Sequence, residues 1–255
     1  MENKVEKYYG QYGQDSIMKQ FFDRKNINKG VFVDIGASEG KRLSNTLLLE
    51  ENGWTGICVE AHPSYFDVLK ANRPNSICYS AAAGDRDKVK TPISLNYRAS
   101  LTTLDLSLEG TGQFHGKYYG SRSVKEINGF LNGMHEVEMR TIDSIIDENQ
   151  SSFNKINLIC IDIDGSEKYA FQGLTLDKYS PEILILEHTI IGKQAVNSYA
   201  ANSGYIPAMT VGSDIIFTKT EEDKDLLNSL SVQGEQDRYS MVHIAGLESG
   251  EQEII

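Results

Sequence analysis

The segment of residues 31–40, VFVDIGASEG, constrains the fold of this chain more than any other part of it. Three β-prone apolar residues lead into Asp34, and two glycines, Gly36 and Gly40, follow shortly after it. An apolar helical repeat then begins at Leu43. A strand, a glycine-rich turn and a helix in this order predict the opening unit of a nucleotide-binding α/β fold. The glycines would let the backbone pass close to a ligand, and the helix would offer unpaired N–H groups to it.

The chemistry of this turn favours a cofactor with a cationic end over a dinucleotide. A dinucleotide fingerprint needs a glycine two positions after Gly36, where this chain has Ser38. Asp34 would repel a pyrophosphate, whereas it would attract the amino group and the sulfonium of S-adenosylmethionine. A plain tight turn of an α/β protein is the alternative interpretation of this segment taken alone.

The next predicted strand also ends in an acid. The apolar segment Thr55–Val59 leads into Glu60, whose carboxylate can accept both ribose hydroxyls of a nucleotide-type cofactor. Such charged hydrogen bonds contribute roughly 1.5–3 kcal/mol each. Small residues at Ala61, and around Ala82 after a third strand at 76–80, would leave room for a flat adenine ring. The alternatives are a solvated strand end for the acid and simple close packing for the alanines.

Four short motifs in this order resemble the FkbM-type S-adenosylmethionine-dependent methyltransferases. They are YGQD at 12–15, VDIGA at 33–37 with SNT at 44–46, CVEA at 58–61 and IDIDGSE at 161–167. The resemblance covers residues 8–219, and Asp164 stands where the family usually has glutamate.

The resemblance implies a Rossmann-like class I methyltransferase fold of the α/β class. In that fold a mostly parallel sheet is flanked by helices and closed by an antiparallel C-terminal hairpin. The implied cofactor is S-adenosyl-L-methionine. Together with the strand ends, the motifs predict these cofactor-binding residues: Asp34, Gly36, Ala37, Gly40, Asn45, Glu60, Ala61, Ala82 and Asp162.

Residues 1–220 are expected to form a single methyltransferase domain with one long insertion. Residues 86–135 interrupt the alternation of strands and helices, and an insertion of this length in a compact domain is usually a lid or a binding loop. Its candidates for contact with a sugar or phosphate are His115, Tyr118, Tyr119 and Arg122. Residues 221–255 read as a peripheral acidic tail that carries much of the formal net charge of −11.

The remaining elements follow from apolar runs and capping residues. Asp15 is expected to cap an N-terminal packing helix, and Ser166 is expected to cap a helix after the third motif strand. The apolar runs at 157–161 and 182–186 predict buried parallel strands. Two further strands between 206 and 218, joined by Gly-Ser, predict the closing hairpin.

Composition excludes several classes of protein. A net charge of −11 argues against binding to duplex nucleic acid, which needs a basic face. No apolar run approaches the roughly 20 residues needed to span a bilayer, and the N-terminus lacks a secretory signal. Cys58, Cys78 and Cys160 lack zinc spacing and read as buried thiols in a reducing compartment. These features predict a cytoplasmic protein, and they leave its oligomeric state open.

The residues predicted to carry the chemistry follow two buried strands: Asp162, Asp164, Glu187 and His188. In open α/β sheets the ligand lies beyond the carboxyl ends of the strands. Methyl transfer to oxygen requires alignment of the reactants and removal of the acceptor's proton, for which His188 is the candidate base. Alternatively, the three acids would hold Mg²⁺ or Mn²⁺, and the metal would lower the pKa of the acceptor hydroxyl.

We therefore expect an S-adenosylmethionine-dependent enzyme that O-methylates a sugar, a glycan or a natural-product hydroxyl. An NAD-dependent oxidoreductase would share the strand, turn and helix, but it would want the missing glycine and would tolerate Asp34 badly. A non-catalytic cofactor-binding protein would keep the first two motifs without the acidic strand ends. The acids are present, which favours the enzyme.

Overall fold

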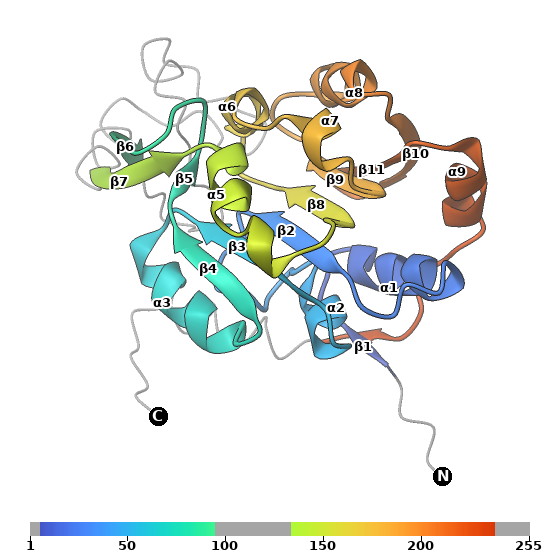
Figure 1. Cartoon of the computed structure of the whole chain (residues 1–255). Coiled ribbons are helices and arrows are strands. Elements are labelled where there is room, and N and C mark those ends of the chain that lie inside the picture. The colour runs from blue at the N-terminus through green and yellow to red at the C-terminus, as the bar shows by residue number, and fades with distance from the viewer. Residues whose placement is uncertain (1–5, 95–133, 238–255) are drawn as a thin grey trace, which may run out of the picture.

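A computed structural model describes residues 6–94 and 134–237 of the chain (Figure 1). Its centre is a seven-stranded sheet in the order β10-β11-β9-β8-β2-β3-β4. The bounds of these strands are β2 (Val31–Ile35), β3 (Thr55–Glu60), β4 (Ser76–Ser80), β8 (Leu158–Ile161), β9 (Ile183–Glu187), β10 (Ile206–Val211) and β11 (Asp214–Thr218).

The pairing of these strands confirms the predicted Rossmann-like fold. Strands β4, β3, β2, β8 and β9 pair in parallel, and β11 runs antiparallel to both β9 and β10. The chain winds outward from β2 through β3 to β4, and later returns to place β8 on the other side of β2. The strand order therefore reverses between β2 and β8, and ligands of open α/β sheets bind at such a point.

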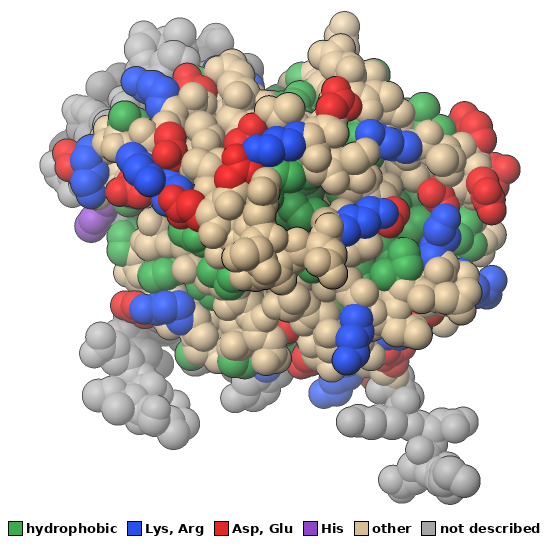
Figure 2. Space-filling model, in the orientation of Figure 1, with side chains coloured by type: hydrophobic (Ala, Val, Ile, Leu, Met, Phe, Trp, Pro, Cys, Tyr) green, Lys and Arg blue, Asp and Glu red, His purple; other side chains and the backbone are tan. Residues whose placement is uncertain are grey.

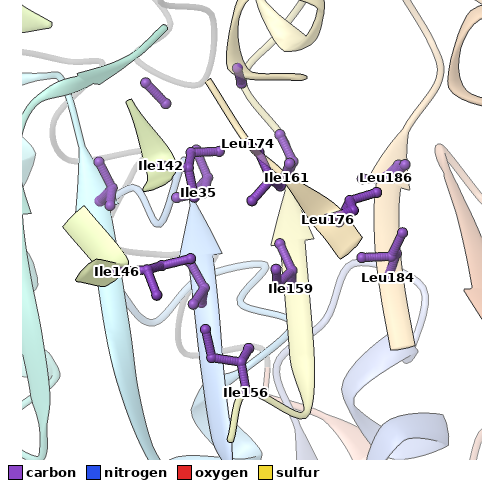
Figure 3. Packing of buried hydrophobic residues seen from close by; sticks show 14 of the residues in the cluster. Ile35, Ile142, Ile146, Ile156, Ile159, Ile161, Leu174, Leu176, Leu184 and Leu186 are labelled. Carbon is purple, nitrogen blue, oxygen red and sulfur yellow. The ribbon is translucent and has the colours of Figure 1, made fainter. Parts of the chain in front are cut away.

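Helices cover both faces of this sheet, as Figure 1 shows. One face packs against α1 (Gln14–Arg24), α2 (Leu47–Glu51), α3 (Pro63–Asn72) and α9 (Glu221–Asn228). The other packs against α5 (Ile142–Glu148), α6 (Glu167–Gln172), α7 (Leu176–Tyr179) and α8 (Lys193–Asn202). Figure 3 shows isoleucine and leucine side chains of β2, β8 and β9 meeting those of α5 and α7 on this second face.

The alternation of side chains along β2 decides what lies on each face. Val33 and Ile35 join the core under α5 to α8, whereas Phe32 joins the core under α1 to α3. Because successive side chains of a strand point to opposite faces, Asp34 shares the face of Phe32. The acid of the first motif is therefore directed toward the helices α2 and α3.

Two smaller sheets flank the central one. Strands β5 (Ala82–Ala83), β7 (Met134–Arg140) and β6 (Val89–Ser94) form a three-stranded sheet in that order. The antiparallel pair β6–β7 brings together the two ends of the predicted insertion. Residues 95–133 of that insertion, with His115, Tyr118, Tyr119 and Arg122, lie outside the described residues. A short 3₁₀ turn, η2 (Gln150–Ser152), precedes β8.

The segment from residue 221 to residue 237, which the sequence analysis assigned to the acidic tail, packs onto the N-terminal helix. Leu227 of α9 is fully buried. Ser16 donates to the carbonyl oxygen of Gln233 at 2.8 Å, and the backbone amide of Gln233 donates back to the Ser16 hydroxyl at 2.9 Å. Strand β12 (Glu235–Gln236) then pairs in parallel with β1 (Lys7–Tyr8). Acidic side chains gather over α9 in Figure 2, and the first turn of α9 contains Glu221, Glu222 and Asp223.

Two local predictions were wrong, and a third was correct in position only. Gly13, with φ of 79°, stands at the N-cap of α1, while Asp15 lies inside the first turn and accepts from the backbone amide of Tyr9 at 2.6 Å. Ser166 stands at the N-cap of α6 as predicted, but its side chain makes no capping bond. Leu43 adopts a left-handed conformation, so the helix of the first motif begins only at Leu47.

Within residues 6–94 and 134–237, no helix combines the length and the apolar character that a membrane crossing requires.

A buried arginine at the end of α3 ties the first motif together. The Arg73 side chain is fully buried, and its Nε donates to Glu50 Oε2 at 2.7 Å. Its Nη2 donates to Thr46 Oγ1 at 2.8 Å, and that hydroxyl donates to Asp34 Oδ2 at 2.5 Å. The guanidinium also lies over the ring of Phe32 at 5.0 Å. One cation therefore joins the end of β2 to α2 and α3.

We expect Arg73→Met to lower the free energy of unfolding by about 3–5 kcal/mol, because it leaves Asp34 and Glu50 buried without their cation. Urea unfolding followed by circular dichroism measures the change. Arg86→Met is the matched control, since this side chain is 68% exposed and its ion pair within the described residues is with Asp85. That control should stay within about 0.5 kcal/mol of the parent. Equal effects of the two substitutions would show that the buried network contributes nothing to stability.

Candidate active site

A cleft opens at the carboxyl ends of the parallel strands, where the strand order reverses. It encloses about 1000 Å³, part of which is open to solvent. Its walls come from the turn after β2, the end of β3, the residues around β5 and the end of β8. Of the residues predicted to bind the cofactor, the following line it: Asp34, Gly36, Ala37, Asn45, Glu60, Ala61, Ala82 and Asp162.

One part of the cleft is apolar. Ala61, the run Ala81–Ala83 and Ile93 of β6 contribute to its wall. Ala82 and Ile93 are both buried and pack with each other in one cluster, against which Ala61 lies. Small side chains beside a branched one leave an apolar space, which suits an aromatic ring.

Glu60 stands next to this apolar part with its carboxylate held by the backbone. Its Oε2 accepts from the amide of Ser38 at 2.8 Å, and its Oε1 accepts from the amide of His62 at 2.6 Å. A carboxylate has about four acceptor sites, so these two bonds leave acceptor capacity for a ligand. Burial raises the pKa of Glu60 to about 7, although hydrogen bonds from the backbone act in the opposite direction.

Asp34 lines the cleft, but the buried guanidinium of Arg73 already offsets its charge. Its Oδ2 lies 3.7 Å from Nη1 of Arg73 and accepts the Thr46 hydroxyl at 2.5 Å. Burial nevertheless raises the pKa of Asp34, while the positive charge of Arg73 acts to lower it. Asp34 was predicted to attract the cationic end of the cofactor, but its charge already faces the guanidinium of Arg73. No pattern in the sequence indicated this internal cation.

The two glycines of the first motif meet protein atoms rather than empty space. A Cβ on Gly36 would lie 1.8 Å from the backbone oxygen of Asp162, so this glycine allows the end of β2 to approach the end of β8. A Cβ on Gly40 would lie 2.6 Å from Leu69 and 2.7 Å from Arg73. Gly40 does not line the cleft and instead permits packing against α3.

The acids predicted to hold a metal come together. Asp162, Asp164 and Glu187 each offer a carboxylate oxygen, and these oxygens lie within 4.8 Å of one another. Burial is the largest cause of their raised pKa values, which reach about 6 for Asp162 and about 10 for Glu187. The pKa of Asp164 is raised by burial and by the charges of Asp162 and Glu167. Glu167 itself accepts from the backbone amides of Ile163 and Gly165 and so shapes the turn.

The members of this acidic cluster differ in their access to the cleft. Asp162 and Asp164 line it, whereas Glu187 is 7% exposed and stands behind them at the end of β9. The Oε2 atom of Glu187 is buried without a hydrogen-bond partner among the described residues. An orphaned carboxylate oxygen next to two others suits a hard divalent cation.

His188 follows Glu187, and its backbone amide donates to the carbonyl of Ser213 at 3.0 Å. Its Nε2 is buried and finds no hydrogen-bond partner within the described part of the chain. His188 is not among the described residues that line the cleft. The imidazole of His188 therefore does not face the part of the cleft where the cofactor residues gather.

Three of the six described non-glycine residues with positive φ lie at the same place. Ser38, Leu43 and Asp164 line the cleft, and each has a positive φ of 51° to 57°. A bulky residue such as leucine seldom adopts this conformation, which costs about 1–3 kcal/mol. Strain of this kind persists where surrounding contacts hold the backbone, and it often marks a ligand site.

The site also includes polar residues that were not predicted from the sequence. Asp214 of β11 pairs in register with Glu187, accepts from Gln14 Nε2 at 2.6 Å, and has a pKa raised by burial to about 7. Arg42 lines the cleft between two matched motifs. The position of Arg42 between Gly40 and the SNT motif was the one local signal that could have predicted its place in the cleft. The contact between Gln14 and Asp214 spans 200 residues, and no local pattern indicates it.

The model of the methyltransferase FkbM domain matches residues 34–238. The chain therefore belongs to the family of FkbM methyltransferase domains. A comparison with curated proteins finds no match.

Two solved structures are similar to this chain over most of its length. A TehB-like SAM-dependent methyltransferase from Corynebacterium glutamicum ATCC 13032 Kitasato is 11% identical with a TM-score of 0.41, covering 82% of this chain and 89% of that one. The precorrin-6y C5,15-methyltransferase from Geobacter metallireducens GS-15 is 10% identical with a TM-score of 0.39, covering 83% of this chain and 92% of that one.

The raised pKa of Glu60 predicts a pH-dependent stability. Because its folded pKa of about 7 lies above the ordinary glutamate value of 4.5, its stabilising contribution is complete below about pH 4.5 and is lost as the pH rises through 7. Relative to Glu60→Gln, the parent should therefore lose up to about 3 kcal/mol between about pH 5 and about pH 8. Urea unfolding of both proteins at the two pH values measures this.

Glu222→Gln, at an exposed position on α9, serves as the control for this measurement. Its difference from the parent should not change between the two pH values. A constant difference between the parent and Glu60→Gln would contradict the prediction.

Proposed function

We propose that this protein transfers a methyl group from S-adenosylmethionine to a hydroxyl of a sugar, a glycan or a natural-product small molecule. The observation that carries the proposal is the lining of the cleft. An alanine-rich wall, a backbone-held Glu60 and an acid-rich part with Asp162 follow one another along the strand ends. These three environments suit an adenine, a ribose and a cationic amino-acid end, respectively.

The charges of the cleft favour this cofactor over NAD. Asp34, Glu60, Asp162 and Asp164 line it, against a single Lys or Arg side chain, Arg42, among its described residues. A pyrophosphate would bring further negative charge into this set, whereas a sulfonium and an ammonium would relieve its repulsion. A non-catalytic cofactor-binding protein would have no use for the acidic cluster beside the cleft, so the enzyme is the better proposal.

Methyl transfer to a hydroxyl is an in-line displacement. The bond between carbon and sulfur breaks as the bond between carbon and the acceptor oxygen forms, and the sulfur keeps the electron pair of the broken bond. The hydroxyl proton must pass to a base. Asp162 and Asp164 face the cleft and can orient the hydroxyl, while His188, which lies outside the described lining, is the candidate that takes the proton.

A divalent cation is the second route for removing this proton. Asp162, Asp164 and Glu187 would hold Mg²⁺ or Mn²⁺, as their close oxygens and the orphaned Oε2 of Glu187 support. Such an ion, when bound, lowers the pKa of a coordinated hydroxyl. Asp162 and Asp164 would then orient the acceptor through the same carboxylates that line the cleft.

We expect calorimetric titration to give binding of S-adenosylmethionine and no binding of NAD. Glu60→Ala should weaken the affinity for S-adenosylmethionine about tenfold or more, because it removes the charged acceptor of the ribose hydroxyls. Glu222→Ala, an exposed substitution on α9, should leave the affinity unchanged. Binding of NAD in place of S-adenosylmethionine would overturn the proposal.

The two proton routes are separated by titrating Mn²⁺ into the protein saturated with S-adenosylhomocysteine, with electron paramagnetic resonance as the readout. In the metal route, Asp164→Asn should weaken Mn²⁺ binding about tenfold or more, because it removes one charged ligand. Asp67→Asn, whose side chain is 82% exposed, should leave Mn²⁺ binding unchanged.

In the base route, EDTA should leave methyl transfer to a sugar panel unchanged, and His188→Ala should lower it about 100-fold or more. Full activity of both Asp164→Asn and His188→Ala would remove the acidic cluster and the histidine from the mechanism.

A further inference from the structure

We propose that Arg42 binds the α-carboxylate of the methyl donor and makes the cleft selective for nucleosides that carry an amino-acid end. This inference rests on the proposed function. It assigns a binding residue to the α-carboxylate, for which the motifs provide none. Arg42 lies in the loop of residues 40–46, which joins the turn after β2 to helix α2.

The excess of acidic side chains in the cleft favours a cationic residue as the partner of the donor's carboxylate. The donor carries two cationic groups and one carboxylate. Four carboxylates line the cleft, and a ligand carboxylate placed among them without a cation would be strongly repelled. Arg42 is the only Lys or Arg among the described residues of the lining. Its planar guanidinium can bind a carboxylate through two parallel hydrogen bonds.

The other nearby cations cannot serve this purpose. The Arg73 side chain is fully buried and already faces Asp34 and Glu50. Lys41, the neighbour of Arg42 in sequence, is not among the residues that line the cleft.

The loop that carries Arg42 is built to hold one conformation. The backbone amide of Arg42 donates to Glu39 Oε1 at 2.6 Å, and the amide of Gly40 donates to the carbonyl of Ala37 at 2.9 Å. The hydroxyl of Ser44 accepts from the amides of Thr46 and Leu47 at 3.3 and 3.1 Å. These bonds fix the backbone on both sides of the arginine.

The strain at Leu43 supports the same inference. Leu43 has φ of 57° and forms an isolated parallel bridge with Gly10 of the N-terminal segment. Both Arg42 and Leu43 line the cleft, so the strained residue stands next to the arginine. A left-handed leucine costs free energy, and the surrounding contacts hold it where the loop turns toward the ligand site.

The loop also lies on the side of the cleft that an amino-acid end would occupy. The Asn45 side chain reaches β8, since its Nδ2 lies 3.4 Å from Sγ of Cys160. The apolar part with Ala82 belongs to the opposite side, next to the ends of β3 and β4, since the amide of Ala81 donates to the carbonyl of Glu60. A donor with its purine against the alanines would therefore direct its other end toward this loop.

The experiment compares two donor analogues by calorimetry. S-adenosylhomocysteine carries the carboxylate, and methylthioadenosine has the same nucleoside and thioether without the amino-acid end. Arg42→Met should weaken the binding of S-adenosylhomocysteine by roughly ten- to a hundredfold and leave methylthioadenosine within about twofold of the parent. Arg42→Lys, which keeps the charge without the fork, should give an intermediate loss. Lys41→Met is the matched control and should bind both analogues as the parent does.

Unchanged binding of S-adenosylhomocysteine by Arg42→Met would overturn the inference. An equal loss of both analogues by Arg42→Met and by a second variant, Arg42→Gln, would also overturn it, because the residue would then act on the shape of the cleft. Retained binding of methylthioadenosine shows that a variant is folded. A parent protein that binds neither analogue would instead refute the proposed function.

Discussion

The burial of the Arg73 guanidinium is the interaction on which the rest of this structure depends. A charge inside a protein core is costly unless carboxylates and hydrogen bonds offset its desolvation. Glu50, Thr46 and Asp34 provide these contacts, and they belong to α2, to the loop before it and to β2. The floor of the cleft is therefore closed by a charge network, and Asp34 keeps its position without a ligand.

Because Arg73 offsets the charge of Asp34, the negative charge that remains uncompensated in the cleft comes from Glu60, Asp162 and Asp164. Burial raises the pKa of each of these acids. Desolvated carboxylates that repel one another become more stable when a cation arrives, so the site is prepared for a cationic ligand. The left-handed residues of the lining add strain at the same location.

The sequence predicted the parts of this arrangement that depend on neighbours along the chain. The bounds of β10 and β11, and the position of Glu60 at the end of β3, agree with the structure because apolar runs and turn residues act locally. The sequence also placed Gly36 correctly in a tight turn that lines the cleft, but it did not indicate a second reason for this glycine. The structure shows that the backbone oxygen of Asp162 occupies the space a side chain would need.

What the sequence determined by itself is the order of the elements, the family and the presence of acids at the strand ends. Only the tertiary structure decided which partners some of these acids meet. The faces of a sheet are filled by helices from distant parts of the chain, so Arg73 comes to compensate Asp34, and Gln14 comes to bind Asp214. The meeting of Glu187 with Asp162 is different, because the sequence predicted it from acids that follow two neighbouring parallel strands. Local patterns carry no information on the contacts of Arg73 and Gln14, because these contacts arise from packing across the whole domain.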